Sequence, residues 1–374
     1  MTTPADESGP EQGRYLLCSR KDGIGARLNN LVWTWRLARS ANLKTLCFWP
    51  PLDPYYGESR GAGDLLDVYS LTTSALRHEL KIVDGRPFDF IHPKVVRLEE
   101  TDRHDPNAYA VIPKAVRNSK HGPVPLIDSG IGPILQPGED PEAATREAQA
   151  LFARLPVNLR ILQNLKQVEK THGLKRMVAV HVRGGDIVEV LRDACAKFTP
   201  EDLAPGSVLD RYTEHFFRGC ASPPSYIRLV RRYLTEGYGI LFFSDTPGAA
   251  HPFQKRFPYK LMTAESFETP HLTGIQRALF EILLMSRCHA IIGAKSMFSN
   301  LASLIGGAPI IDARRETTPE EFLRIYKRAV RFDALSPEIR TGISEVLVRK
   351  LEENRLLDLW GTGGEDVLRL LAAA

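Results

Sequence analysis

The chain has 374 residues, of which 43% are hydrophobic and 25% are charged. This length exceeds one ordinary hydrophobic core and favours two domains, and the composition is typical of a soluble globular protein. The formal net charge of +4 is small for a nucleic-acid-binding protein, whereas a mild positive balance suits an anionic small ligand. We therefore expect no nucleic-acid partner.

The cysteines and the N-terminal segment narrow the class of protein further. Five scattered cysteines without a C-x-x-C pair argue against a disulfide framework and against a structural zinc site. The segment MTTPADESGPEQGR is polar and acidic, unlike a signal peptide, and we expect residues 1–14 to form a disordered tail. Since no apolar run approaches the roughly 20 residues needed to cross a bilayer, the sequence predicts a cytoplasmic protein without a membrane span.

The N-terminal region alternates between strand and helix patterns. The sequence predicts a strand over residues 15–18, a glycine-rich loop, a helix over 28–38, and a strand over 45–49 that ends in two prolines. Residues 53–140 are rich in turns, and three short apolar runs predict further strands at 80–83, 108–112 and 124–127. This order is typical of a parallel α/β sheet.

Two helices then lead to a second α/β series. Asp140 and Pro141 predict the start of one helix, and residues 157–170 predict another that bridges two domains. Later strands are predicted at 177–182, 239–243, 290–292 and 309–312, with helices at 225–234, 276–287 and 297–305, and helices again from 337. We interpret residues 194–224 as a long loop, a candidate mobile lid.

These elements predict two Rossmann-like domains that face each other across a cleft. We expect an N-terminal domain over residues 15–172, a C-terminal domain over 173–336, and C-terminal helices over 337–374. Ligands bind such folds at the carboxyl ends of the strands, so motifs at strand ends are the candidates for a functional site.

The first motif is Gly23-Ile24-Gly25, between a predicted strand and helix. Two glycines let the backbone approach a ligand, and free N–H groups at a helix start favour an anion. A dinucleotide-binding fingerprint would place a third glycine where Leu28 stands, and an acid rather than Trp49 at the end of the second strand. A dehydrogenase is therefore disfavoured, and an ordinary tight turn is the alternative interpretation.

The second motif is VAVHVRGGD, residues 178–186. Arg183 stands at the strand end, where a guanidinium forms two N–H bonds with a phosphate. His181 lies two residues earlier and shares its strand face, while Gly184 and Gly185 leave room for a bulky ligand. Asp186 follows as a partner of Arg183 or as a base; a salt bridge beside a glycine turn is the alternative.

Polar groups also end the later strands. Ser244 and Asp245 follow one strand. Ser296 precedes a helix that it can cap, and its hydroxyl can also bind a phosphate. Glu281 interrupts the apolar stretch ALFEILLM, where a carboxylate needs a partner such as the N–H donors of guanine or a surface salt bridge. The sequence has no H-x-x-x-H or Walker motif, which disfavours zinc hydrolases and P-loop enzymes.

Three segments together resemble the α1,6-, α1,2- and protein O-fucosyltransferases. They are GIGARLNNLVWTWRLARSANLKTLCFWPP, HVRGGD and ALFEILLMSRCHAIIGAKSMFSNLASLIGG, in this order. The resemblance implies a GT-B fold and an inverting, metal-independent transfer of fucose from GDP-β-L-fucose, with no cofactor. It implies a GDP-sugar and a carbohydrate or small-molecule acceptor as partners.

The resemblance also implies roles for single residues. Arg183 would hold the β-phosphate, Glu281 would bind guanine, and His181 would lie at the nucleoside end. The remaining donor-binding candidates line the diphosphate or the wall beside the sugar: Gly23, Gly25, Arg27, Ser244, Asp245, Lys295, Ser296, Met297 and Phe298.

The chain departs from this family at two positions. Gly184 stands where many relatives have a second arginine, so another phosphate contact would come from Lys295 or Arg27. Leu191 stands where the α1,6 branch has the glutamate that serves as its catalytic base. Asp186 and Glu189 remain as candidate bases in this chain.

Acceptor binding is predicted at an aromatic cluster. Trp49, Tyr55 and Tyr56 follow the second strand, and sugars stack on aromatic rings; packing of a proline-rich loop is the alternative. Two other functions remain open, a glycosyltransferase with a different donor and a nucleotide-sugar-binding protein without catalysis.

Overall fold

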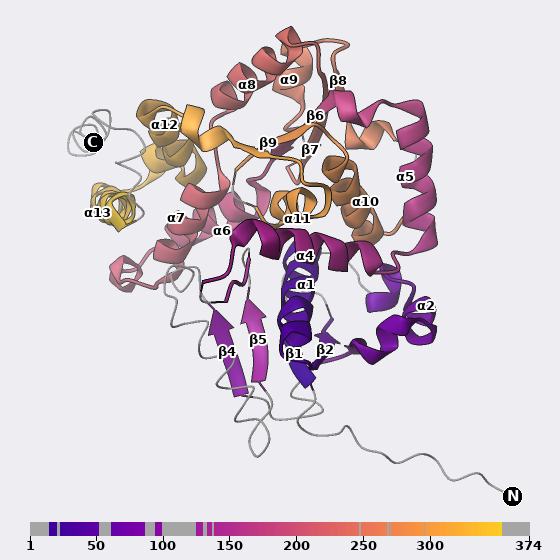
Figure 1. Ribbon diagram of the computed structural model, residues 1–374. Coiled ribbons are helices and arrows are strands. Elements are labelled where there is room, and N and C mark those ends of the chain that lie inside the picture. Colours follow the sequence, from indigo (N-terminus) through magenta and orange to yellow (C-terminus); the bar gives the residue numbers. More distant parts are fainter. Residues whose placement is uncertain are drawn as a thin grey trace, which may run out of the picture. The chain divides into compact units, whose positions relative to one another are not determined.

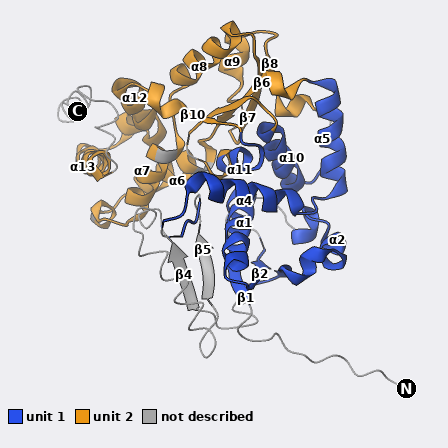
Figure 2. Cartoon of the chain, viewed as in Figure 1, with its two compact units in different colours: residues 1–172, 269–286, 300–307 blue, residues 173–268, 287–299, 308–374 orange. Residues whose placement is uncertain are grey.

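The structure is a computed structural model of the chain (Figure 1). The residues that it describes are 15–20, 23–51, 61–86, 94–98, 125–129, 133–136, 138–246, 248–267, 269, 271–294 and 296–353. By its internal contacts the chain divides into two compact units, shown in Figure 2. Unit 1 comprises residues 1–172, 269–286 and 300–307, and unit 2 comprises residues 173–268, 287–299 and 308–374.

Unit 1 is built on a parallel sheet with the strand order β3-β2-β1-β5-β4. The strands are β1 (Tyr15–Ser19), β2 (Lys44–Trp49), β3 (Leu80–Asp84), β4 (Lys94–Leu98) and β5 (Pro125–Ser129). Every strand pair is parallel, so all five carboxyl ends lie at one edge. The order reverses between β1 and β5, which is the position where doubly wound sheets bind ligands.

Two helices of unit 1, α4 and α10, pack against the long buried helix α1. The helices of this unit are α1 (Ile24–Ser40), α2 (Val68–Thr73), α4 (Pro141–Arg154), α5 (Leu159–Thr171) and α10 (Gly274–Ser286), with short 3₁₀ helices at Ala62–Asp64 and Ala75–His78. Helix α1 packs against β1, β2, α4 and α10. As predicted, Asp140 caps α4, because its carboxylate accepts hydrogen bonds from the backbone N–H groups of Glu142 and Ala143.

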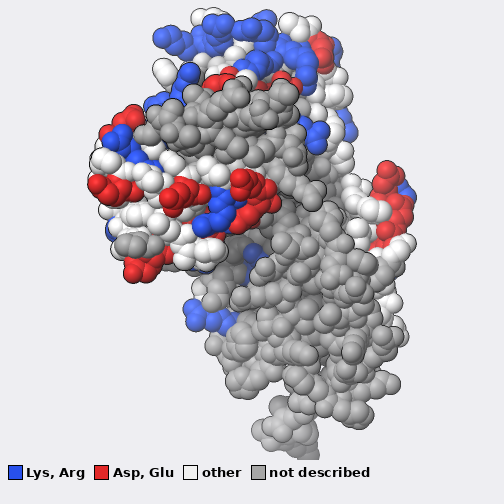
Figure 3. Space-filling model, turned by 90° about the vertical axis from the view of Figure 1, so that its left-hand side faces the viewer, with Lys and Arg blue, Asp and Glu red and all other residues white. Residues whose placement is uncertain are grey.

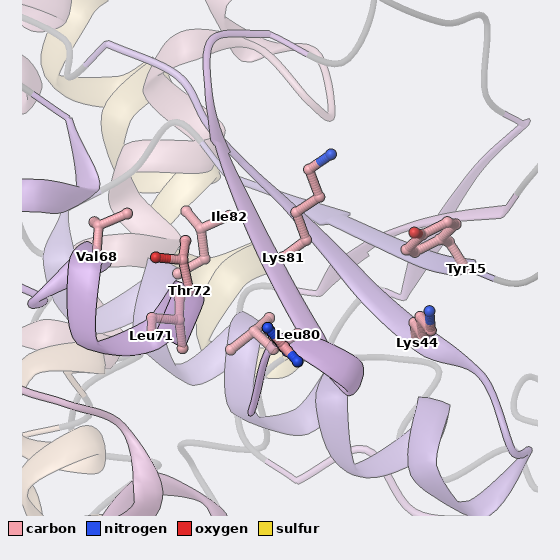
Figure 4. A pocket seen from close by; sticks show the side chains of 9 residues that line it. Tyr15, Lys44, Val68, Leu71, Thr72, Leu80, Lys81 and Ile82 are labelled. Atoms are coloured by element: carbon pink, nitrogen blue, oxygen red, sulfur yellow. The ribbon is translucent and has the colours of Figure 1, made fainter. Parts of the chain in front are cut away.

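A cavity of about 300 Å³ lies at the opposite edge of this sheet (Figure 4). Its lining includes Tyr15, Lys44 and Leu80, which are the first residues of β1, β2 and β3. The cavity is therefore remote from the carboxyl ends of the strands, where the motifs of unit 1 stand.

Unit 2 contains a second parallel sheet with the order β10-β9-β6-β7-β8. Its strands are β6 (Met177–Val182), β7 (Gly239–Ser244), β8 (Leu261–Thr263), β9 (Ala290–Gly293) and β10 (Ile310–Asp312). Strand β6 is central and spans the residues that the sequence predicted. Two Rossmann-like α/β units are thus confirmed.

The helices of unit 2 form two hydrophobic clusters. They are α6 (Gly185–Ala196), α7 (Val208–Gly219), α8 (Pro223–Thr235), α9 (His251–Arg256), α12 (Pro319–Val330) and α13 (Pro337–Glu353), with 3₁₀ helices at Leu174–Arg176, Pro200–Leu203, Ala264–Ser266, Ala313–Glu316 and Phe332–Ala334. Helix α11 (Met297–Gly306) begins in unit 2 and ends in unit 1. One cluster packs α8 and α9 on the sheet, and the other joins α6, α7, α12 and α13 through stacked rings such as Phe217 and Phe322, 4.7 Å apart.

The prediction of a long loop over residues 194–224 is wrong. This segment contains the end of α6, a 3₁₀ turn and all of α7. Helix α7 begins after Ser207, whose hydroxyl accepts a hydrogen bond from Asp210 N–H, and it buries Leu209, Phe216 and Phe217. Since this apolar face belongs to the hydrophobic cluster, the segment is a packed part of the unit and does not form the expected lid.

The other predicted elements agree with the structure to within a few residues at their ends, whereas α2, α6, α7, α9, α12, β4 and β8 were not predicted. The predicted strand at 108–112, the expected tail over 1–14 and the chain after Glu353 lie outside the described residues.

A buried ion pair joins α7 to α13. Asp210 and Lys350 are 3% and 6% exposed, and their charged groups lie 2.9 Å apart. Arg349 also contacts Asp210 at 2.7 Å. Burial opposes ionisation of Asp210, but hydrogen bonds from Gly206 N–H, Lys350 and Arg349 hold its pKa below the ordinary value.

We predict that Asp210→Ala lowers the free energy of unfolding by about 3 kcal/mol, since removing one partner leaves the other charge buried. This loss is at the lower end of the range for broken buried ion pairs, because Lys350 keeps its ion pair with Glu353 at 2.7 Å. Urea denaturation followed by circular dichroism measures it. The exposed Asp193→Ala in α6 is the control, and equal losses in both variants would contradict this account.

Candidate functional site

The candidate site of unit 2 lies at the carboxyl ends of β6, β7 and β9. Strand β6 pairs with β7 on one side and β9 on the other, and His181 is in register with Phe243 and Gly293. The chain order reverses between β6 and β9, so this edge is the topological switch point where doubly wound sheets bind ligands. Residues that are far apart in the sequence meet here.

His181 is buried at the end of β6, and one nitrogen of its ring lacks a hydrogen-bond partner among the described residues. Its side chain is 6% exposed, and its ring stacks on Phe298 of α11, with centroids 5.2 Å apart and planes 28° apart. The backbone carbonyl of His181 accepts a hydrogen bond from the Tyr226 hydroxyl at 3.2 Å. Its Nδ1 atom has no partner in the described part of the chain. Because buried polar groups are almost always paired, this nitrogen is a candidate ligand contact.

The imidazole of His181 is neutral at physiological pH. Burial, and then the charge of Arg183, lower its pKa from an ordinary value of 6.5 to about 3. A neutral imidazole is a hydrogen-bonding group, not a cation for phosphate, and it is a weak base.

Arg183 and Gly184 continue the chain beyond β6. Arg183 is half-buried, and Gly184 is the N-cap of α6, a position without a capping side chain. A Cβ atom added to Gly184 would meet only Val188, at 3.9 Å. Packing therefore leaves space for a larger residue at this position.

Asp245 compensates for the missing cap of α6. Its Oδ1 atom accepts hydrogen bonds from Gly184 N–H at 3.3 Å, Gly185 N–H at 3.4 Å and the Thr246 hydroxyl at 3.1 Å. A carboxylate at a helix start is favourable. The Gly184 and Gly185 N–H groups at the start of α6 are thus bound to Asp245.

Ser244 fixes the end of β7 to the end of β6. Its hydroxyl donates to the carbonyl of Val182 at 2.8 Å and accepts from Thr246 N–H at 3.0 Å. These bonds hold the segment that carries Asp245 beside the start of α6.

Ser296 caps α11. The buried Ser296 hydroxyl accepts a hydrogen bond from Phe298 N–H at 3.2 Å, which is the capping geometry that the sequence left open. Met297 and Phe298 are half-buried in the first turn, and Lys295 lies outside the described residues.

The candidate bases lie on α6. Asp186 belongs to the first turn and Glu189 to the next, where its side chain is exposed. Leu191 is fully buried in the hydrophobic cluster of α6 and α7. Position 191 is therefore part of the apolar core in this chain.

The other candidates belong to unit 1. Gly23 is the N-cap of α1, and Gly25 lies buried in its first turn. Arg27 donates to the carbonyls of Pro50 at 2.6 Å and Pro51 at 3.3 Å and lies 5.4 Å from the ring centre of Trp49. These contacts engage its guanidinium with the end of β2.

The predicted acceptor residues and Glu281 differ in their burial and in whether the structure describes them. Trp49 is 2% exposed, and its Nε1 atom has no hydrogen-bond partner among the described residues. Tyr55 and Tyr56 lie outside the described residues. Glu281 lies half-buried on α10, which groups with unit 1.

Sequence reasoning missed two contacts of the site. The stacking of His181 on Phe298 joins residues 117 positions apart, and the Tyr226 hydroxyl reaches the backbone of β6 from α8. Within the part of the chain that the structure describes, no cluster of metal-ligating side chains occurs, and no helix has the length and apolarity to cross a bilayer.

The protein thus consists of two Rossmann-like units, and in unit 2 the strand β6 ends at His181 and Arg183. No family model and no curated protein matches the sequence. The structure is similar to the fucosyltransferase NodZ from Bradyrhizobium, with a TM-score of 0.49 and 16% identity over 80% of this chain and 94% of that chain.

It is also similar to POFUT1 in complex with GDP-fucose, with a TM-score of 0.46 and 13% identity over 81% of this chain and 99% of that chain. A structure of NodZ α1,6-fucosyltransferase soaked with GDP-fucose is similar with a TM-score of 0.47 and 14% identity, over 80% of this chain and 94% of that chain.

We predict that His181→Gln flattens the pH dependence of stability in acid. The folded pKa of His181 is about 3, so between pH 6.5 and 3 the unfolded chain gains a proton that the folded chain excludes. The free energy of unfolding then falls with pH by up to about 1.4 kcal/mol per unit, and the glutamine variant lacks this contribution.

Urea denaturation at several pH values between 4.5 and 7 gives the two slopes. The exposed His251→Gln is the control and keeps the wild-type slope. Equal slopes for the wild type and His181→Gln would show that the buried ring is protonated in the folded protein.

Proposed function

We propose that the chain is an inverting glycosyltransferase that moves L-fucose from GDP-β-L-fucose to a hydroxyl group of a glycan or small-molecule acceptor. The observation that carries the proposal is the grouping of Arg183, the unpartnered His181 and the capped start of α11 at one switch point. The sequence resemblance supplies the donor, and it implies that no metal takes part.

Arg183 stabilises the leaving group in this proposal. The acceptor oxygen attacks the anomeric carbon from the face opposite the phosphate, the bond from that carbon to the phosphate oxygen breaks, and GDP leaves with added negative charge. A fixed guanidinium next to this charge lowers the barrier because it is in place before the reaction. Its half-buried position strengthens the interaction relative to water.

The diphosphate lies on the α11 side of Arg183. The start of α6 already holds the Asp245 carboxylate, which repels another anion there. Helix α11 has no acidic residue in its first turn, and Lys295 stands before it in sequence. We assign the second phosphate contact to Lys295, since the guanidinium of Arg27 is bound to two proline carbonyls.

His181 holds the donor as a neutral group. Its Nδ1 atom forms a hydrogen bond with the nucleoside portion, and the stacked Phe298 ring fixes the plane of the imidazole. Glu281 binds guanine, as the resemblance implies.

The acceptor proton passes to a carboxylate on α6. Asp186 and Glu189 are the candidates, since Leu191 carries no proton acceptor. Leu191 also favours a second function, a nucleotide-sugar-binding protein without transfer.

We predict that GDP raises the melting temperature of the protein, that UDP and NAD do not, and that Arg183→Ala removes most of the GDP effect. A ligand that binds the folded state stabilises it by mass action. A thermal-shift titration measures this for each nucleotide, with EDTA present to remove adventitious metal.

Arg176→Ala is the matched control. Arg176 is exposed and precedes β6 at its amino end, so this variant keeps the GDP effect. A shift with UDP or NAD but not with GDP would overturn the proposal, as would an unchanged GDP effect in Arg183→Ala.

We predict that Asp186→Asn or Glu189→Gln lowers the transfer rate from GDP-fucose by about a hundredfold or more, the usual contribution of a general base. The GDP thermal shift of that variant persists, because the base contacts the acceptor. If the wild type binds GDP but neither transfers fucose nor hydrolyses GDP-fucose, the binding-protein alternative replaces the enzyme.

A further inference from the structure

Exposed basic side chains gather on one face of unit 2, over α8, α9 and the turn that follows α9. We call this surface the basic face. Figure 3 shows blue side chains crowded at the height that α8 and α9 have in Figure 1. The residues of the basic face are Arg228, Arg231, Arg232, Lys255, Arg256, Tyr259 and Lys260, all exposed.

The packing of the two helices explains this concentration. Tyr226 of α8 and Phe253 of α9 point inward, with ring centroids 6.4 Å apart, and both belong to the hydrophobic cluster on the sheet. Arg228, Arg231 and Arg232 follow one another at helical spacings of three and four, so they share the outer side of α8. The polar sides of both helices thus form one surface.

Few acidic groups neutralise the basic face. Arg228 pairs with Glu321 at 2.8 Å, and Arg232 lies 4.0 Å from Glu316. Arg231, Lys255, Arg256 and Lys260 have no ion pair with any described residue. Residues 223–235 and 251–260 contain no acidic residue at all. The surface therefore attracts anions.

Tyr259 directly precedes Lys260 and follows Arg256 by three residues. Its side chain is fully exposed, and its φ of 66° is in the left-handed region, a conformation that costs about 1 kcal/mol for a residue of this kind. Phe257, two residues earlier, packs in the hydrophobic cluster and accepts a hydrogen bond from Lys260 N–H at 3.3 Å. The turn thus holds one aromatic ring inward and one outward.

We propose that the basic face binds the surface of an anionic phospholipid membrane, with Tyr259 at the level of the headgroups. Tyrosine rings favour the membrane–water interface, and lysine and arginine near an anionic leaflet add attraction. A single-stranded nucleic acid stacks on several aromatic rings and follows a cationic groove. The basic face has one fully exposed ring at the tip of a turn, and this geometry fits a bilayer better.

Its place in the fold leaves the candidate site accessible. Lys260 directly precedes β8, whose first residue Leu261 pairs with Ile240 near the amino end of β7. The turn of Tyr259 therefore lies at the amino edge of the sheet, whereas His181 and Arg183 lie at the carboxyl edge. A membrane bound at this turn does not occupy the strand ends of the site.

The test is cosedimentation with lipid vesicles, either phosphatidylcholine alone or phosphatidylcholine mixed with phosphatidylglycerol. The wild type binds only the anionic vesicles, and added salt weakens the binding. The triple variant Lys255→Gln, Arg256→Gln, Lys260→Gln binds about a hundredfold more weakly, since each cation contributes roughly fivefold.

Two further variants separate this effect from a general loss of charge or of folding. Lys166→Gln, Lys170→Gln, Lys175→Gln removes the same charge from exposed lysines outside the basic face and binds like the wild type. Tyr259→Asn removes the ring but keeps a residue that tolerates positive φ. It binds several-fold more weakly and melts no lower than the wild type.

Three results would overturn the proposal: no binding of the wild type to the anionic vesicles, equal binding to both vesicle types, or equal losses in the two triple variants. Binding of single-stranded DNA without binding of vesicles would also overturn it and assign the surface to a polynucleotide. The GDP-dependent thermal shift is measured on the same variants and remains unchanged. Failure of the membrane proposal is thereby distinguishable from failure of the proposed function.

Discussion

Parallel pairing on both sides of β6 is the constraint on which unit 2 depends. Hydrogen bonds to β7 and β9 fix three strand ends in register, so His181, Ser244 and Gly293 reach one edge together. The Ser244 hydroxyl then fastens the ends of β6 and β7, and the Tyr226 hydroxyl holds the His181 carbonyl from α8. Side chains from distant parts of the sequence acquire their geometry from this ladder before any ligand contributes.

The same pairing gives the site its electrostatic character. Burial and the neighbouring guanidinium both disfavour protonation of His181, so Arg183 is the cation of the strand end and His181 a neutral neighbour. The carboxylate of Asp245 lies close by at the start of α6. The positive charge of Arg183 follows β6, and the negative charge of Asp245 lies at the start of α6. An anionic ligand is therefore favoured near Arg183 and disfavoured near Asp245.

The sequence predicted those features that depend on local pattern. The run over residues 177–182 is apolar except for His181 and predicted the observed ends of β6, and Asp140 with Pro141 located the start of α4. Helix α6 was missed because Gly184 and Gly185 read as a turn, and its cap comes from Asp245, about 60 residues away. The stacking on Phe298 and the burial of Leu191 likewise depend on tertiary packing, which no short motif encodes.

Gly184 has a consequence for sequence patterns that describe this strand end. An added Cβ meets only Val188, at ordinary contact distance, so a substitution there leaves the fold intact. A sequence pattern that demands two consecutive arginines therefore overlooks a chain that keeps the same strand end with a single charge, Arg183.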